Sequence, residues 1–513
     1  MGYSLLATLL AAMFVVVPLD DRPVTYQLPR MLGAIAGVSV ATPPRALLGR
    51  YLRFGDPEGI ARWLREDSPR DARAFVISTD MIAYGGLIAS RTPDTAKGLA
   101  FSRLRDLAAF RATRPNASFA TFGTVMRLAP TGVPAIGAGA HFFAAGAAWP
   151  KIQEYANLPD PPQTLEQRAL VQRLREQLGP TLDAYLATRA RDLDVDLFAL
   201  QLLAEGGFDR LILGQDDAGP VGLHLHDLAT LRSTVKRFGV GERAAIEPGA
   251  DELAMVLVGA ALAREAQIVP RVRVVYSRSD GATLNDPLEF APIDGTIGDI
   301  VRASGGVRDD AAATSTIDLF VRVPGTSDAA ERAFVDTLAA AVARQRIVAV
   351  VDLTFLAPND YVQQRALVEE LIARKIAGKI AAFASWNTTA NTVGTALPEA
   401  IAVAAGLHAG NYDARAHAQF MLDRYADDYA FHDFTRPAIN AALTAAGIAD
   451  HTYLLPDVAQ QTASAARADL WPRALALLAS IYPQYRDADL TITLPWDRTF
   501  ETKLDVRVDR RVP

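Results

Sequence analysis

The chain contains no cysteine among its 513 residues. This absence excludes thiol catalysis, cysteine-ligated zinc, iron–sulfur clusters and disulfide bonds. The chain also lacks an excess of positive charge, because its 52 basic residues are outnumbered by 58 acidic ones and the net charge is −6. The sequence therefore lacks the basic footprint of nucleic-acid binding and the polybasic segment that anionic lipids attract, and we expect no nucleic-acid partner.

Several catalytic motifs are missing as well. The sequence has no GxxxxGK[ST], no GxGxxG after an apolar run, no GxSxG and no HExxH. These absences argue against P-loop nucleotide hydrolysis, Rossmann dinucleotide chemistry and the serine-elbow esterase mechanism. Beyond the N-terminus, no apolar stretch is long and uninterrupted enough to span a bilayer.

The N-terminus is apolar. Residues 5–12 resemble the apolar core of a short signal peptide with cleavage near Ala11 and Ala12, but no Lys or Arg precedes Arg22. We interpret residues 1–13 as a leader peptide or a simple N-terminal extension. The two interpretations predict different locations for the protein, because a leader peptide would direct it out of the cytoplasm.

Short β-branched apolar runs alternate along the chain with amphipathic helical stretches. Uninterrupted apolar runs are typical of parallel strands covered by helices on both faces. The sequence predicts an α/β fold with a largely parallel sheet, barrel-like or doubly wound. The runs are FVVVPLDD, AFVISTD, FATFGTVMR, RLILGQDD, RVRVVYSRSD, TIDLFVRVP, IVAVVDLTF and IAAFASWNT.

This rhythm also divides the chain. We predict an α/β domain over residues 14–270, interrupted at 149–205 by a helical insertion that Gly179-Pro180 splits in two. Residues 271–414 form a second α/β subdomain. Residues 415–513 are mostly helical and end in a probable strand pair.

Acidic clusters follow the ends of several predicted strands, where the ligands of parallel sheets bind. A single Asp there often caps the next helix, but a doubled acid is unfavourable unless something stabilises it. Since strand side chains alternate in direction, only one of Asp216 and Asp217 is expected to face a pocket. The candidate catalytic carboxylates are Asp216, Asp217, Asp251 and Glu252. The candidate substrate-binding residues on the same rim are Asp20, Asp21, Arg22, Asp80, Tyr84 and Arg127.

The stretch SWNTTANTVGTAL adds an aromatic–amide patch. Trp386 can stack on a sugar, and Asn387 and Asn391 supply paired donors and acceptors. The structural alternative is that Thr and Asn cap the next helix while Trp386 fills a gap beneath it. The pair His224 and His226 opens a predicted helix, where residues two apart do not share a face, so at most one faces the site.

This combination predicts a carbohydrate-active hydrolase, most simply a glycosidase that uses paired carboxylates. Two alternatives stay open. The first is a metal-dependent hydrolase of a phosphate or amide, with the aspartates as ligands of a divalent cation. The second is a non-catalytic binding protein for a sugar or cell-wall fragment. We assign no metal ligands and expect no cofactor apart from such a cation. The expected partner is a small molecule or a glycan, and the oligomeric state is left open.

Six stretches together resemble a family of bacterial proteins of about this length, known as a domain of unknown function. The stretches are VPLDDRPVTYQLP, STDMIAYGGLIASR, LILGQDDAGPVGLH, PGADE, WNTTANTVGTAL and LPWDRTFE. The resemblance runs from about residue 14 to the C-terminus and implies no activity or catalytic residues. Members of the family often lack the first dozen residues, which favours a leader peptide and a periplasmic or extracellular location over a cytoplasmic one.

Overall fold

The computed structural model describes residues 12–130, 148–354 and 361–511. It contains two open, fully parallel sheets and a separate antiparallel hairpin. The α/β prediction is confirmed, and the sheets are doubly wound and do not close into a barrel. The predicted leader, residues 1–13, falls almost entirely outside the described residues.

The first sheet has the strand order β2-β1-β3-β4-β5-β6, and the second has the order β11-β10-β9-β7-β8. Counted from its own first strand, each sheet has the same order 2-1-3-4-5, to which the first sheet adds β6. The strands of the first sheet are β1 Met13–Val17, β2 Ser39–Ala41, β3 Ala74–Ser78, β4 Ser118–Val125, β5 Arg210–Gln215 and β6 Ala244–Pro248. The others are β7 Arg271–Tyr276, β8 Val307–Arg308, β9 Ile317–Arg322, β10 Ile347–Asp352, β11 Ala382–Ser385, and the hairpin strands β12 Tyr485–Thr493 and β13 Lys503–Arg510.

All eight predicted apolar runs form strands. Every residue of β3 and of β9 is buried, as expected for strands with helices on both faces. In the two parallel sheets, the three strands without a matching run are short and partly exposed: β2, β6 and β8. Their burial is too incomplete to leave a continuous apolar signature.

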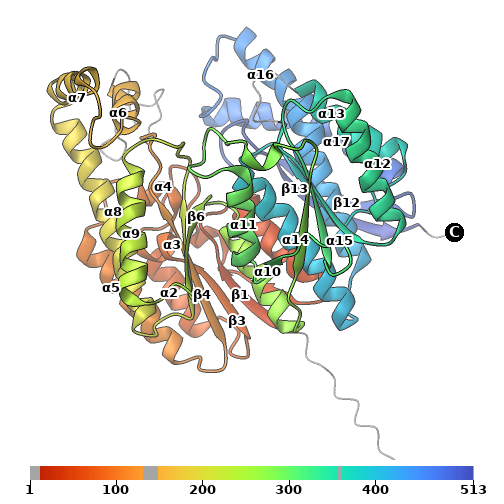
Figure 1. The fold of residues 1–513 in the computed structure, drawn as a ribbon, viewed down its shortest axis with the longest axis horizontal. Coiled ribbons are helices and arrows are strands. Elements are labelled where there is room, and N and C mark those ends of the chain that lie inside the picture. The colour runs from red at the N-terminus through yellow and green to blue at the C-terminus, as the bar shows by residue number, and fades with distance from the viewer. Residues whose placement is uncertain (1–11, 131–147, 355–360, 512–513) are drawn as a thin grey trace, which may run out of the picture.

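Helices cover both sheets (Figure 1). Those of the first half are α1 Leu28–Ile35, α2 Pro57–Glu66, α3 Thr79–Ala83, α4 Leu87–Ser90, α5 Lys97–Ala112, α6 Ala148–Ala156, α7 Leu165–Leu178, α8 Pro180–Ala204, α9 His224–Phe238 and α10 Leu253–Glu265. The second half has α11 Ile293–Ala303, α12 Asp328–Ala343, α13 Tyr361–Ala373, α14 Thr389–Ala409, α15 Ala414–Arg424, α16 Arg436–Ala445 and α17 Pro456–Ile481. The described residues also include two π-helical segments, Pro23–Gln27 and Tyr425–Thr435, and two 3₁₀ turns, Arg45–Leu47 and Gly281–Thr283.

One hydrophobic core joins the two sheets. Val16 of β1, Val256 of α10, Val393 of α14 and Val351 of β10 all belong to it. Helices α10 and α14 lie between the sheets, and Figure 1 shows them in the middle of the molecule. This shared helical layer holds the carboxyl ends of both sheets in a fixed relation.

The helical insertion forms α6, α7 and α8, and Gly179 separates α7 from α8 as predicted. The first sheet ends with β6 and α10, and the second begins with β7 at Arg271. Helices α15 to α17 and the β12–β13 hairpin form the mostly helical C-terminal part. No helix within the described ranges is long and apolar enough to cross a membrane.

Candidate functional site

A cavity lies at the carboxyl ends of the two sheets, where loops from distant parts of the chain meet. It is narrow, with a cavity volume of about 40 Å³, and is partly open to solvent. We call it the central cavity. Its walls come from the segments after β1, β6 and β11, from the π-helix Tyr425–Thr435 and from the loop between β12 and β13. It is lined by Pro23, Val24, Asp251, Ala384, Ser385, Trp386, Asn387, Asn391, Thr392, Thr395, Arg424, Asp427, Asp428, His432, Phe500, Glu501 and Thr502.

Arg22, in the segment after β1, forms an ion pair with Asp251 in the loop after β6. Its guanidinium donates to both oxygens of Asp251 at 2.6 Å, and also to Asp20 at 2.7–3.0 Å. The Arg22 side chain is only 5% exposed. Charge-assisted bidentate pairs of this kind fix the orientation of a carboxylate. The structure therefore brings together Asp20, Arg22 and Asp251, three residues that the sequence placed on one rim.

Glu501 supplies another carboxyl group to the cavity wall. Its Oε1 accepts a hydrogen bond from Arg498 at 2.5 Å. Burial raises the pKa of Glu501, and the negative charge of Asp251 contributes to the rise while Arg498 and Arg22 oppose it. A carboxyl group whose pKa is raised in this way is a candidate proton donor.

Trp386 begins the wall contributed by the second sheet. Its φ of 64° lies in the left-handed region, which is unusual for a bulky residue and occurs most often at functional sites. The indole is stacked on His432, and the Arg436 guanidinium lies 4.5 Å from its ring centre. Asn387 and Asn391 follow on the same wall, at the start of α14. The predicted aromatic–amide patch thus lines the central cavity.

The two π-helical segments both flank this cavity. Pro23 and Val24 come from the first, and Asp427, Asp428 and His432 come from the second. π-Helical turns concentrate at functional sites because they change which side chains face inward. Here the segment Tyr425–Thr435 brings two acids and a histidine to one wall.

Arg424 balances the acids of this wall. Its guanidinium donates to Asp423 and to Asp428 and lies 3.5 Å from Asp427. Burial raises the pKa of Asp428 to about 7, although Arg424 opposes the rise. Burial also lowers the pKa of His432 well below its ordinary value, so this ring is neutral. The wall consequently presents polar groups with little unpaired charge.

Asp216 and Asp217 differ in their surroundings. The Asp216 side chain is 9% exposed and pairs with Arg91, whereas that of Asp217 is 45% exposed and lies 3.7 Å from Arg127. Partial burial and the Asp216 charge raise the pKa of Asp217 to about 6, and Asp251 adds to the rise. Only one of the two acids thus reaches open space, next to the cavity's Asp251.

Glu252 lies away from the cavity. It is buried against the backbone of Gly249 and Gly394, and one of its oxygens accepts from the Ala250 amide at 3.3 Å. Burial raises the pKa of Glu252 well above its ordinary value.

Asp80 and Tyr84 form a separate buried group with Asp192. Asp80 accepts two hydrogen bonds from Thr124, and burial together with the Asp192 charge raises its pKa to about 7. Tyr84 lies under the Arg191 guanidinium, 4.5 Å away. Neither residue is among those that line the central cavity.

Asp21 turns away from the central cavity, and its carboxylate accepts from the indole nitrogen of Trp496 at 2.8 Å. Of the two predicted histidines, His224 is buried at the start of α9 and His226 is exposed. Neither lines the cavity, which agrees with the prediction that at most one could.

The sequence argument did not single out Glu501, Phe500, Arg424, Asp427, Asp428 or His432. Glu501 and Phe500 belong to the stretch LPWDRTFE, which was recognised only as a family motif. The other four lie in the acid- and aromatic-rich run RYADDYAFH, whose density of buried charges was the available signal.

The metal-dependent alternative gains no support from the described part of the chain. Within it, no group of three or more His, Asp or Glu side chains has the geometry to hold a metal ion. The cavity carboxylates are engaged by arginines and by backbone amides, as described above.

The chain belongs to a family of proteins of unknown function (DUF4127), whose family model matches residues 14–505. No curated protein and no solved structure gives a significant match to the chain.

Proposed function

Starting from a family that carries no assigned activity, we propose that this protein is a glycoside hydrolase whose active site is the central cavity. The observation that carries the proposal is the pairing of two carboxyl groups, Asp251 and Glu501, on the wall of one cavity that also contains an aromatic–amide wall. This choice keeps Asp251 from the sequence-based candidates and replaces its expected partner by Glu501.

The two carboxyl groups have different environments, as acid and base in such a pair require. Glu501 is buried, and burial raises its pKa, the direction that a proton donor requires. Asp251 accepts hydrogen bonds from both terminal nitrogens of Arg22, and this cation stabilises the ionised carboxylate that a nucleophile or base requires. Glu501 is therefore assigned as the general acid, and Asp251 as the nucleophile or general base.

Other lining residues suit a sugar. Phe500 is 36% exposed and presents aromatic surface beside the buried Trp386, their ring centres 5.3 Å apart, and Asn387 and Asn391 offer amides to hydroxyl groups. The cavity arginine, Arg424, is paired with aspartates, so a neutral sugar would meet no unpaired cation there.

In the reaction, the Glu501 carboxyl group donates its proton to the glycosidic oxygen as the bond from that oxygen to the anomeric carbon breaks. The Asp251 carboxylate either attacks the anomeric carbon or takes a proton from the water that attacks it. We expect kcat to fall as the pH rises above the pKa of Glu501, because the ionised carboxylate has no proton to donate.

The test uses purified protein and a panel of 4-nitrophenyl glycosides together with unmodified oligosaccharides. We expect Asp251→Asn and Glu501→Gln each to lower kcat by about 10³-fold or more with unchanged far-UV circular dichroism. A matched control is Asp336→Asn, an exposed acid on α12 that pairs with Arg374, and it should keep the wild-type rate.

Two outcomes would overturn the proposal. One is turnover by both folded variants at the wild-type rate. The other is saturable binding of a sugar that the wild type never hydrolyses, which would favour the binding-protein alternative. A stoichiometric divalent ion in protein purified without chelator, lost together with activity in Asp251→Asn, would instead favour metal-dependent hydrolysis.

A further inference from the structure

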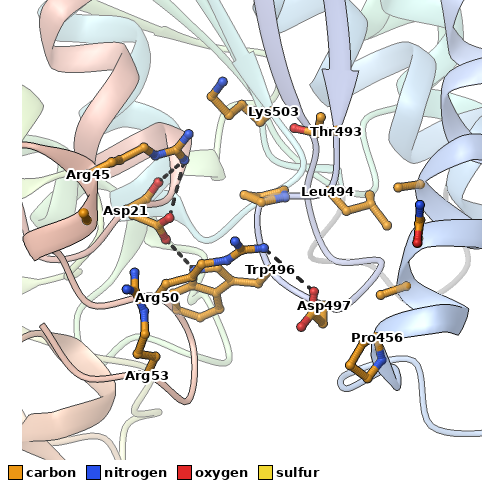
Figure 2. A pocket seen from close by; sticks show the side chains of 15 residues that line it. Asp21, Arg45, Arg50, Arg53, Pro456, Thr493, Leu494, Trp496, Asp497 and Lys503 are labelled. Atoms are coloured by element: carbon orange, nitrogen blue, oxygen red, sulfur yellow. Dashed lines mark hydrogen bonds and ion pairs between the residues drawn. The ribbon is translucent and has the colours of Figure 1, made fainter.

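A second, larger pocket is lined by Trp496, whose ring packs against Arg22. It has a volume of about 530 Å³ and is open to solvent. We call it the basic pocket, because four cationic side chains line it, Arg45, Arg50, Arg53 and Lys503, against the carboxylates Asp21 and Asp497. Figure 2 shows the arginines and Asp21 on one side and Pro456 of α17 on the other.

The arginines are incompletely neutralised. Arg50 approaches Asp497 only to 3.8 Å, and the two side chains are 49% and 40% exposed. Arg53 is exposed and has no ion pair within the described ranges. Exposed pairs of this kind contribute little, so a ligand anion can replace the carboxylate at small cost.

A tight turn holds Arg50 and Arg53 together. Each donates its backbone N–H to the carbonyl of the other, at 2.8 and 2.9 Å. Residues that oppose each other in an antiparallel bridge project to the same face, so both guanidinium groups leave the turn on one side. The pair is thus built into the backbone and does not depend on two independent flexible loops.

Tyr51, inside this turn, is strained. Its φ of 47° lies in the left-handed region, which is costly for a residue with a large side chain. The ring is stacked on Trp496 at 5.0 Å, and its hydroxyl donates to the Thr452 carbonyl at 2.7 Å. These contacts hold the turn in place, and strain maintained in this way is typical of binding sites.

The basic pocket adjoins the proposed active site. Asp21 lines the basic pocket, and the next residue, Arg22, holds the Asp251 carboxylate of the central cavity. The Arg22 guanidinium also lies 4.7 Å from the centre of the Trp496 ring, whose indole nitrogen donates to Asp21. Trp496 and Arg22 therefore link the basic pocket to the proposed catalytic cavity through direct contacts.

We propose that the basic pocket binds an anionic substituent, a carboxylate or a phosphate group, of the glycan that is cleaved in the central cavity. The proposal rests on the proposed function and names its substrate class as acidic glycans. Arg50 and Arg53 are the principal ligands of the anion, since planar guanidinium groups bind both carboxylates and phosphates in bidentate fashion. Arg45 and Lys503 contribute less, because Arg45 is paired with Asp21 and Lys503 with Asp505.

The experiment measures binding by titration calorimetry, independently of turnover, with the Asp251→Asn variant used to prevent hydrolysis. The carboxylate arm compares tetragalacturonate with its fully methyl-esterified, neutral counterpart. The phosphate arm compares glucose 6-phosphate with glucose. The Arg50→Gln/Arg53→Gln double variant is tested beside Arg168→Gln/Arg173→Gln, which removes the same charge from exposed positions of α7.

We expect at least one charged ligand to bind more tightly than its neutral counterpart, with an affinity that falls as salt is added. The Arg50/Arg53 double variant should lose about ten- to hundredfold in affinity for that ligand and none for the neutral one. The α7 control should behave as the parent. The arm that shows the preference identifies the anion as a carboxylate or as a phosphate.

Equal affinity for charged and neutral ligands, or a charge preference that survives in the Arg50/Arg53 double variant, overturns the proposal, as does the absence of any binding. Failure of the proposed function looks different. A charge preference that depends on Arg50 and Arg53, in a protein that hydrolyses no glycan, leaves the anion site standing and rejects the hydrolase. Hydrolysis of neutral glycans without any charge preference rejects the anion site alone.

Discussion

Removing the Arg22 guanidinium should destabilise the protein strongly, because this group compensates two carboxylates at once. The perturbation is Arg22→Met, which keeps most of the side-chain volume and removes every donor. The variant loses the contacts to Asp20 at 2.7–3.0 Å and both contacts to Asp251 at 2.6 Å.

The magnitude follows from burial. The Asp20 side chain is 3% exposed, so after the substitution it stays in the protein interior without its cation. Breaking one side of a buried ion pair typically costs about 3–5 kcal/mol. Asp20 still accepts from the Thr25 hydroxyl at 2.9 Å, and Asp251 is partly hydrated, so we expect the lower part of this range.

A double-mutant cycle tests the cause. Urea unfolding at pH 7, followed by circular dichroism and by tryptophan fluorescence, gives the free energy of unfolding for Arg22→Met, Asp20→Asn and the double variant. Because the substitutions share one contact, the double variant should cost less than the sum of the two by about 1–3 kcal/mol. Additivity within about 0.5 kcal/mol would refute the reasoning. Arg168→Met, on the exposed side of α7, should stay within about 0.5 kcal/mol of the wild type.

Three further predictions concern stability. Burial raises the pKa of Glu247 to about 8 from 4.5, so the native state binds this proton more tightly and stability should fall as the pH rises between those values. Glu247→Gln should remove that loss, gaining about 2–4 kcal/mol over the wild type between pH 5 and pH 9, and parallel stability–pH curves would contradict this. Gly214→Ala places a Cβ 2.2 Å from the Gly249 carbonyl oxygen and should cost about 1–3 kcal/mol, whereas Gly98→Ala, with nothing within 4 Å, should cost nothing; equal urea midpoints would count against the reasoning. Trp386 has a φ of 64°, so the Trp386→Gly variant should have a free energy of unfolding about 1 kcal/mol higher than that of Trp386→Ala. The reverse order in urea unfolding would argue against backbone strain.

The fold was predictable wherever burial is complete. Runs such as AFVIS and IDLFVR are buried at every position, so their composition alone predicts covered parallel strands. The short strand Ser39–Ala41 is partly exposed and owes its existence to pairing with β1, which no local pattern encodes. Whether the sheets close into a barrel depends on strand order, which is likewise a property of long-range pairing.

The site was predictable in its first half only. The rim argument placed Asp251 and Arg22 on one rim, and the two side chains meet there. Asp216 and Asp217 differ in exposure as expected, although both follow the last residue of β5 and so do not owe the difference to strand alternation. Glu501 could not be found in this way, because it follows no strand of either parallel sheet and reaches the cavity from the β12–β13 connection. The segment Tyr425–Thr435 is π-helical, so the 3.6-residue period of an α-helix does not predict which of its acidic side chains point into the cavity.

The contact between Trp496 and Asp21 spans 475 residues, nearly the whole chain. During synthesis the N-terminal half can fold first, and the Arg22–Asp251 pair, 229 residues apart, can form while the rest is still being made. Glu501, which we propose as the general acid, and Trp496 both lie in the β12–β13 connection and are synthesised after both parallel sheets. A chain truncated before this connection would therefore lack the proposed proton donor and the indole that packs on Arg22, however much of the two sheets it had formed.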